Sequence, residues 1–133
     1  MNDMNWNSLG MTEKVYDILR QYQTYEPDHM GTVFVSSYQI ALALDEKTRE
    51  KIGKPIGGAG TGESSLAGYI AKELSQRISR GEIENIEGAW LARKHILDVQ
   101  FKDKEGGREF SPAGGNKDVI LSMFRIKPHV NDR

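Results

Sequence analysis

Residues 32–44, TVFVSSYQIALAL, contain the strongest local folding signal in the chain. Ser36 and Gln39 have the spacing of a capping box. In this motif the serine hydroxyl accepts a hydrogen bond from the backbone amide of the glutamine, and the glutamine side chain accepts one from the backbone amide of the serine. The preceding residues 32–35 are β-branched or aromatic and favour a brief strand. The pattern therefore predicts a short strand that leads directly into a helix beginning at Ser36 or Ser37.

Apolar side chains at helical spacing continue on both sides of this segment. The helix that starts at the capping box is expected to run to about residue 52, because Gly53 suits a helix C-terminus. Residues 12–22 carry an apolar stripe of helical period, and Thr12 is a suitable N-cap. Residues 64–79 carry a row of apolar side chains spaced four apart. The sequence thus predicts three helices.

The C-terminal half has strand character. Residues 97–102 alternate apolar and polar side chains, and residues 119–127, VILSMFRIK, predict a second strand. The loop between them is rich in Gly and Lys, so the two strands are expected to form a hairpin with a long tip. Residues 82–96 fit a strand or a short helix interrupted at Gly88, and an extended entry followed by a short turn is the preferred interpretation.

Length and composition exclude several classes of protein. The 133 residues suit one domain, expected over residues 12–127 between a flexible leader (1–11) and a flexible tail (128–133). The chain has no cysteine, which excludes disulfide scaffolds, thiol catalysis and cysteine-ligated zinc. No apolar run approaches the ~20 residues of a membrane span. No signal segment opens the chain, and a cytoplasmic location is expected.

The predicted order is a helix, a short strand, two helices and a β-hairpin. Over roughly residues 12–127 this order resembles the winged-helix superfamily of DNA-binding domains. In that family the third helix of a three-helix core enters the major groove, and the hairpin "wing" contacts the backbone or minor groove. The resemblance implies an α+β fold with a three-helix core and a C-terminal wing. One departure is the connection of about ten residues between the second and third helices, where a helix-turn-helix has three or four.

The charges are unevenly distributed along the chain. Eighteen basic and nineteen acidic side chains give a formal net charge of −1. Residues 1–46 carry a net charge of −5, residues 47–80 carry +4, and residues 81–133 carry nine charges of each sign. The basic segment coincides with the helices that would contact DNA if the resemblance to the winged-helix superfamily holds.

The candidate DNA contacts belong to this basic segment or to the predicted wing. Serine and glutamine side chains can bond base edges, while lysine and arginine suit phosphates or guanine. The set is Lys47, Lys51, Lys54, Ser65, Tyr69, Lys72, Gln76, Arg77, Arg80, Lys102, Lys104, Arg108 and Lys117. An ordinary solvated helix face has a similar composition, so that alternative stays open.

The glycine-rich residues 57–64, GGAGTGES, imitate a phosphate-binding loop. Glu63 stands where the Walker pattern needs lysine, which counts against nucleotide hydrolysis. Two uses remain: an anion site at the N-terminus of the following helix, or a connector whose glycines supply positive φ. The three histidines form no metal-binding motif, so neither metal nor cofactor is expected.

The leading hypothesis is a non-catalytic DNA-binding protein that regulates genes or takes part in a mobile-element process. Its partner would be double-stranded DNA, and it would form a homodimer if it reads two half-sites, as such domains often do. The alternative is a protein–protein interaction module on the same fold, because a fold hosts many functions. A nuclease or a nucleotide-dependent enzyme is the weakest interpretation.

Overall fold

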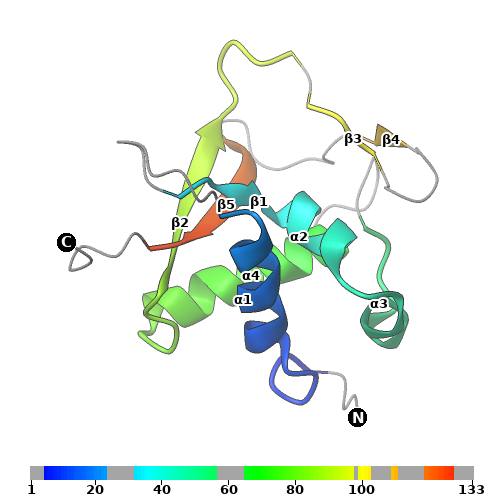
Figure 1. The fold of residues 1–133 in the computed structure, drawn as a ribbon. Coiled ribbons are helices and arrows are strands. Elements are labelled where there is room, and N and C mark those ends of the chain that lie inside the picture. Colours follow the sequence, from blue (N-terminus) through cyan, green and yellow to red (C-terminus); the bar gives the residue numbers. More distant parts are fainter. Residues whose placement is uncertain are drawn as a thin grey trace.

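A computed structural model describes residues 5–23, 32–56, 65–97, 99–102, 109–110 and 119–127. Its elements in chain order are α1 (Met11–Gln21), β1 (Val35–Ser36), α2 (Ser37–Ala43), α3 (Glu46–Ile52), α4 (Leu66–Ser79), β2 (Ile86–Ala92), β3 (Phe101–Lys102), β4 (Glu109–Phe110) and β5 (Val119–Ile126). Helices cover one face of an antiparallel sheet, and Figure 1 shows this arrangement. The expected α+β class is confirmed.

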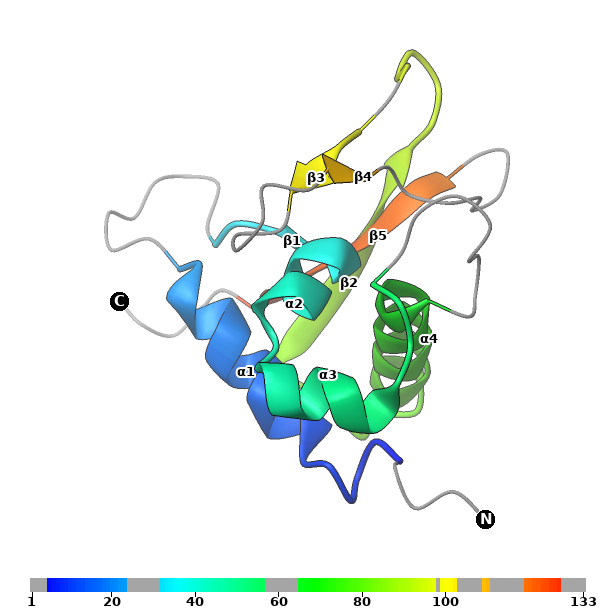
Figure 2. The same ribbon diagram turned by 90° about the vertical axis from the view of Figure 1, so that its right-hand side faces the viewer.

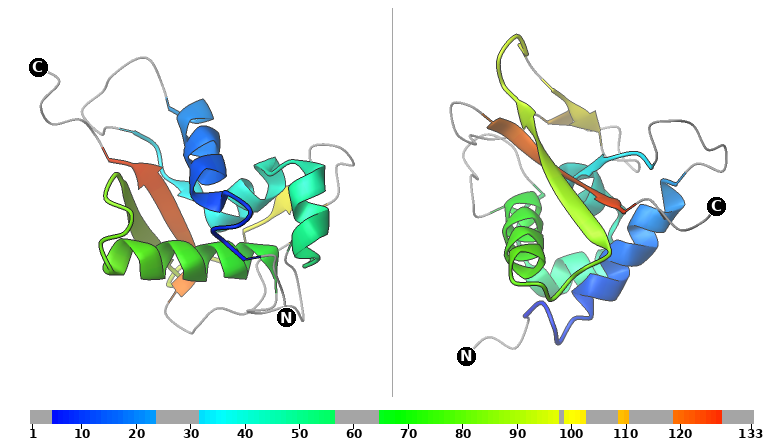
Figure 3. Two further views of the ribbon diagram at one scale, coloured as in Figure 1. Left: turned by 90° about the horizontal axis from the view of Figure 1, so that it is seen from below. Right: turned by 90° about the vertical axis from the view of Figure 1, so that its left-hand side faces the viewer.

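The sheet has the strand order β1-β5-β2, so the last strand in the chain lies at its centre. Val35 of β1 and Gly88 of β2 both pair with Phe124 of β5. Figure 3 (right) shows the sheet in front of the helices. Side chains at alternate positions of β5 face the helices, and Phe124 and Ile126 are buried there.

The core lies between this face of the sheet and helices α1, α2 and α4. Its fully buried members include Val15 from α1, Ile40 from α2, and Ile70 and Leu74 from α4. These positions follow the helical spacing of the sequence, which is why the apolar stripes could be recognised without a structure. Figure 2 shows α1 and α4 on opposite sides of the molecule.

The capping box is confirmed. The Gln39 amide donates to Ser36 Oγ at 3.1 Å, and the Ser36 amide donates to Gln39 Oε1 at 2.9 Å. The strand before it is shorter than predicted, because β1 covers Val35–Ser36 alone.

The prediction of one helix from the capping box to residue 52 is wrong. The chain leaves helical geometry at Leu44 and Asp45, and a second helix, α3, begins there. Asp45 caps α3: its carboxylate accepts from the Thr48 amide at 3.0 Å and from the Thr48 hydroxyl at 2.7 Å. An aspartate that bonds the backbone locally competes with helix continuation. Gly53 ends α3 with φ 73°, as expected of a glycine in the left-handed region.

Two side chains of the segment expected as a flexible leader, residues 1–11, are buried in the structure. Trp6 is 2% exposed, and Met11 is fully buried. Thr12 is not the N-cap of α1, which begins one residue earlier, after Gly10. Its hydroxyl accepts a hydrogen bond from Trp6 Nε1 at 2.8 Å. The apolar indole surface favours burial, and Thr12 satisfies its single polar group.

The predicted hairpin is paired differently. Residues 82–96 contain the long strand β2, and β5 pairs with β2 rather than with residues 97–102. Of residues 97–102, the structure places 101–102 in a strand, which pairs with β4, and Leu97 is fully exposed. The long antiparallel pair is therefore formed by β2 and β5, which residues 93–118 connect. The tail, residues 128–133, lies outside the described residues.

Candidate nucleic-acid interface

Ser65 is a structural residue and not the expected base contact. It is 1% exposed, and its Oγ accepts a hydrogen bond from the Gly68 amide at 2.9 Å. A serine in extended geometry directly before a helix is an N-cap, and its hydroxyl serves one of the free amides of the first turn. The α4 helix consequently begins at Leu66 and not at Ser64, the predicted start.

The N-terminus of α4 has no free amide for an anion among its first three residues. The Leu66 amide donates to the carbonyl of Pro55 at 2.6 Å, and the Ala67 amide donates to the carbonyl of Ile56 at 3.1 Å. The third amide is the one that Ser65 caps. A phosphate at a helix N-terminus needs these donors, so the anion-binding alternative loses its site on α4. Residues 57–64 themselves lie outside the described residues.

The outer face of α4, opposite the core, is polar and lacks carboxylates. Its exposed members within the described helix are Lys72, Ser75, Gln76 and Ser79. Lys72 and Gln76 lie one turn apart, and neither side chain has a hydrogen bond or ion pair in the described part of the chain. We call these four side chains the α4 outer face.

Arg77 faces a different side of α4 and is held within the protein. Its side chain is 11% exposed and forms ion pairs with Glu73, one turn earlier, and with Glu82 at 3.7 Å. Its guanidinium carbon lies 5.2 Å from the ring centroid of Trp6. The expectation that Arg77 contacts DNA is therefore not supported by its position.

Tyr69 and Lys54 extend this cluster. The Tyr69 ring meets Trp6 edge-on, with 5.9 Å between the centroids, and Lys54 Nζ lies 5.9 Å from the Tyr69 centroid. Burial raises the pKa of the Tyr69 hydroxyl, and the negative charge of Glu73 adds to the effect, while Arg77 opposes it. Tyr69 is half-buried and supports the helix, whereas Lys54 is exposed beside it.

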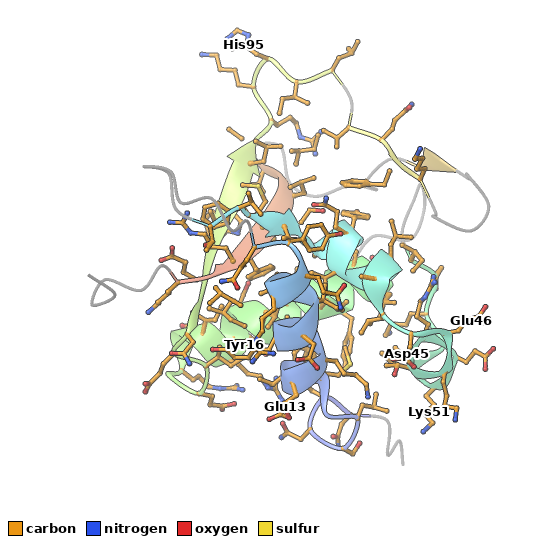
Figure 4. All side chains as sticks on the ribbon, in the orientation of Figure 1. Glu13, Tyr16, Asp45, Glu46, Lys51 and His95 are labelled. Carbon is orange, nitrogen blue, oxygen red and sulfur yellow. The ribbon has the colours of Figure 1, made fainter. Side chains whose placement is uncertain are left out.

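The remaining predicted cations on the helices do not form one positive face. Arg80 pairs with Glu82 at 3.0 Å, so its charge is partly neutralised. Lys47 and Lys51 are exposed on one side of α3, but that short helix also carries Glu46 and Glu50. Figure 4 shows Lys51, Glu46 and Asp45 close together at this end of the molecule.

The predicted wing cations fall partly outside the described residues. Lys104, Arg108 and Lys117 lie there, so only Lys102 is placed. Lys102 is exposed and lies on a cavity of about 480 Å³ between α1, α2 and β3. The cavity lining is Gln21, Tyr22, Gln39, Leu42, Ala43, Gln100, Phe101 and Lys102. No sequence pattern pointed to this cavity, since its walls come from three distant segments.

The structure adds a basic tip that sequence reasoning missed. Arg93, Lys94 and His95 follow directly after β2, and His95 adopts φ 71°, a turn conformation that few residues other than glycine accept. Lys94 and His95 are exposed, and Figure 4 shows His95 at the far end of the molecule from α1. Arg93 Nη2 donates to the carbonyl of Val119 at 3.4 Å. These three residues are adjacent in the sequence. Their position at the end of a strand was not predicted, because the sequence did not establish the structure of residues 82–96.

Two further properties of the described residues concern metal binding and membrane insertion. Within the described ranges, no three His, Asp or Glu side chains gather as metal ligands would. Of the helices that the structure describes, none combines the length and hydrophobicity that crossing a membrane requires.

Comparison with known proteins adds no family assignment. No protein-family model matches the sequence, and no curated protein or solved structure is significantly similar to it.

Proposed function

We propose that this protein is a non-catalytic, cytoplasmic DNA-binding protein with a winged-helix-like fold. The α4 outer face enters a groove of double-stranded DNA, and the tip after β2 touches the backbone beside it. The observation that carries the proposal is the composition of the α4 outer face: a lysine and a glutamine whose side chains have no partner among the described residues, and two serines, with no carboxylate among the four.

The chemistry of this face suits a nucleic acid. Short serine side chains let a helix approach closely, and a glutamine amide can bond an adenine edge in the major groove. Lys72 offers a cation to a phosphate or to guanine. Glu73 does not oppose this, because its carboxylate is ion-paired with Arg77 on another side of the helix.

The tip formed by Arg93, Lys94 and His95 is a second contact in this proposal. The seven residues of β2 span roughly 23 Å at about 3.3 Å per residue. Figure 1 shows β2 starting below, near one end of α4, and running upward, and Figure 4 shows His95 of the tip at the top of the molecule. A major groove is about 12 Å wide, so a helix in the groove and a tip on flanking phosphates are compatible with this span.

The proposal predicts modest affinity and few phosphate contacts. Ion pairs engage Arg77 and Arg80, and the whole chain has a net charge of −1. The logarithm of affinity should fall with the logarithm of salt concentration with a slope of about −0.9 for each neutralised phosphate. We therefore expect a shallow slope, equivalent to about two to four contacts.

The test is fluorescence anisotropy with labelled random duplex DNA over a series of salt concentrations. Lys72→Glu and Lys94→Glu should each weaken binding by about 1–3 kcal/mol and lower the salt slope by about one or more. The matched control is Arg20→Glu, which makes the same charge change on α1, on the opposite side of the molecule from α4. It should leave the salt slope nearly unchanged.

Two results would refute the proposal. The first is a wild-type protein that binds no duplex at low salt. The second is equal loss of binding in Lys72→Glu, Lys94→Glu and Arg20→Glu, which would indicate attraction by total charge alone.

One observation favours the second candidate, a protein–protein interaction module. Trp90 is 70% exposed and Leu97 is fully exposed, and large apolar side chains at the surface commonly mark contacts with other proteins. A protein that binds no DNA but forms a stable complex through Trp90 would support this candidate.

A further inference from the structure

One edge of the β2 strand has no partner strand in the part of the chain that the structure describes. In the sheet order β1-β5-β2 it is an outer strand, and β5 is its single partner among the described strands. Figure 3 (right) shows β2 lying across the front of the sheet, on the side away from β1. A strand edge presents a row of backbone donors and acceptors, which a further strand can bind.

The register identifies the backbone groups that face outward. The Lys127 amide donates to the Asn85 carbonyl at 2.8 Å, so this pair at the start of the ladder is hydrogen-bonded. Hydrogen-bonded and non-hydrogen-bonded pairs alternate along an antiparallel ladder. Ala89 consequently directs its amide and carbonyl at β5, while Gly88 and Trp90 direct theirs away from it.

These outward groups are accessible. Gly88 and Trp90 are exposed, and neither has a backbone hydrogen bond outside the ladder in the part of the chain that the structure describes. A single backbone amide can bond to water instead of to another strand. A row of such groups along a strand edge nevertheless favours pairing with a further strand.

The strand lacks the features that usually block an edge. Its sequence, IEGAWLA, contains no lysine or proline, and its one bulge lies at the far end, between Leu91 and Ala92. Its single charge is neutralised within the chain, because Arg125 Nε lies 2.7 Å from the Glu87 carboxylate. Two copies of this strand therefore meet without net repulsion.

We propose that two copies of this protein associate by antiparallel pairing of their β2 edges. A second copy fits because an antiparallel pair of identical strands is symmetric and needs no complementary charge, and this edge has no net charge to match a charged peptide. The interface rests on the β2 edge alone and is independent of DNA binding.

The pairing that uses the outward backbone groups of Gly88 and Trp90 places Gly88 opposite Trp90 of the second copy. The indole then covers a glycine, as the Phe124 ring covers Gly88 within the chain. Both Gly88–Trp90 pairs of the symmetric dimer exchange hydrogen bonds. A single edge buries less area than the ~1,200 Å² of a small stable interface, so dissociation in the micromolar range is expected.

The first test is sedimentation of the wild-type protein from low to high micromolar concentration, together with NMR amide exchange. A monomer–dimer equilibrium is expected. At high concentration the amides of Gly88 and Trp90 should gain protection, whereas that of Ala89, already bonded to β5, should change little. A single monomeric mass throughout, or a dimer whose Gly88 and Trp90 amides exchange as fast as in the monomer, would overturn the proposal.

The second test uses Trp90→Lys, since a lysine on an edge strand opposes pairing. Trp90 is mostly exposed, so this variant should remain folded by circular dichroism and lose dimerisation at least tenfold. The control is Leu97→Lys, which makes a comparable apolar-to-cationic change beyond the strand. Equal loss in both variants would show association through exposed apolar side chains and not through the strand edge, and it would refute the proposal. Because the test uses no DNA, its failure is distinguishable from failure of the proposed function.

Discussion

The guanidinium of Arg77 lies over the indole of Trp6, with 5.2 Å between the guanidinium carbon and the ring centroid. The contact joins the N-terminal turn to α4 across about half of the chain length. A cation over an aromatic face is stabilising, and it is more so where water is partly excluded. The same contact explains why a basic residue of α4 is not free to bind a nucleic acid.

Replacement of Trp6 by alanine should strongly destabilise the fold. The side chain is 2% exposed and contacts both Arg77 and Tyr69, so its loss leaves a cavity and removes two ring contacts. We expect the free energy of unfolding in urea to fall by about 3–5 kcal/mol. Asn7→Ala, at an exposed neighbouring position, should change it by less than about 0.5 kcal/mol. A Trp6→Ala change as small as that of Asn7→Ala would contradict the packed N-terminus.

Methionine substitutions should distinguish the role of the arginine of α4 in stability from the role of its exposed lysine in DNA binding. Arg77→Met leaves the largely buried Glu73 carboxylate without its cation, and we expect a loss of about 1–3 kcal/mol in urea unfolding. Lys72→Met should leave stability within about 0.5 kcal/mol of wild type but weaken DNA binding in anisotropy measurements. The reverse pattern, with Lys72 important for stability and Arg77 dispensable, would be incompatible with the described contacts.

The cap of α3 predicts a pH dependence of stability. Hydrogen bonds from Thr48 hold the pKa of the Asp45 carboxyl below its ordinary value. Because the pKa is lower in the folded state, the stabilisation is fully present above the ordinary aspartate pKa and is lost as the pH falls through the folded-state value. Asp45→Ala should cost about 1 kcal/mol at neutral pH and less in acid.

The matched variant for this cap is Asp45→Asn, which retains a capping oxygen but does not titrate. Its unfolding free energy, measured in urea from neutral to strongly acidic pH, should lack the acid-dependent component that Asp45 is expected to contribute in wild type. An identical pH profile for both proteins would show that the Asp45 charge is not coupled to folding.

Gly88 should be intolerant of a side chain. A Cβ at this position would lie 3.1 Å from Cε1 and 3.2 Å from Cδ1 of the Phe124 ring, tighter than ordinary van der Waals contact. We expect Gly88→Ala to destabilise by about 1–3 kcal/mol in thermal or urea unfolding. In a Phe124→Leu background the same change should cost less, which a double-mutant cycle measures. Additive effects would show that the ring does not limit this position.

The parts of the fold that were predicted correctly depend on groups close together in the chain. The capping box needs two residues three apart, and the core stripes of α1 and α4 repeat every three or four residues. The break before α3 was missed although its signal is also local. Asp45 and Thr48 have capping spacing, but the continuing apolar pattern outweighed it.

The sequence indicated which helix carries the candidate site, but not which residues of that helix are available to a partner. Basic and polar residues of α4 were recognised, but their availability depends on partners distant in sequence. The Arg77 guanidinium contacts the Trp6 ring, and the first two amides of α4 donate hydrogen bonds to the carbonyls of Pro55 and Ile56. No rule of sequence spacing predicts these contacts.

The sequence by itself determined the α+β class, the helix at Ser36 and the final strand, because capping, helical period and β-branched runs act over a few residues. Only the tertiary structure decided that β5 pairs with β2, that Trp6 belongs to the core, and which cations remain free. Strand pairing and ion pairing join segments far apart in the chain, so their outcome depends on how all the apolar faces are buried together.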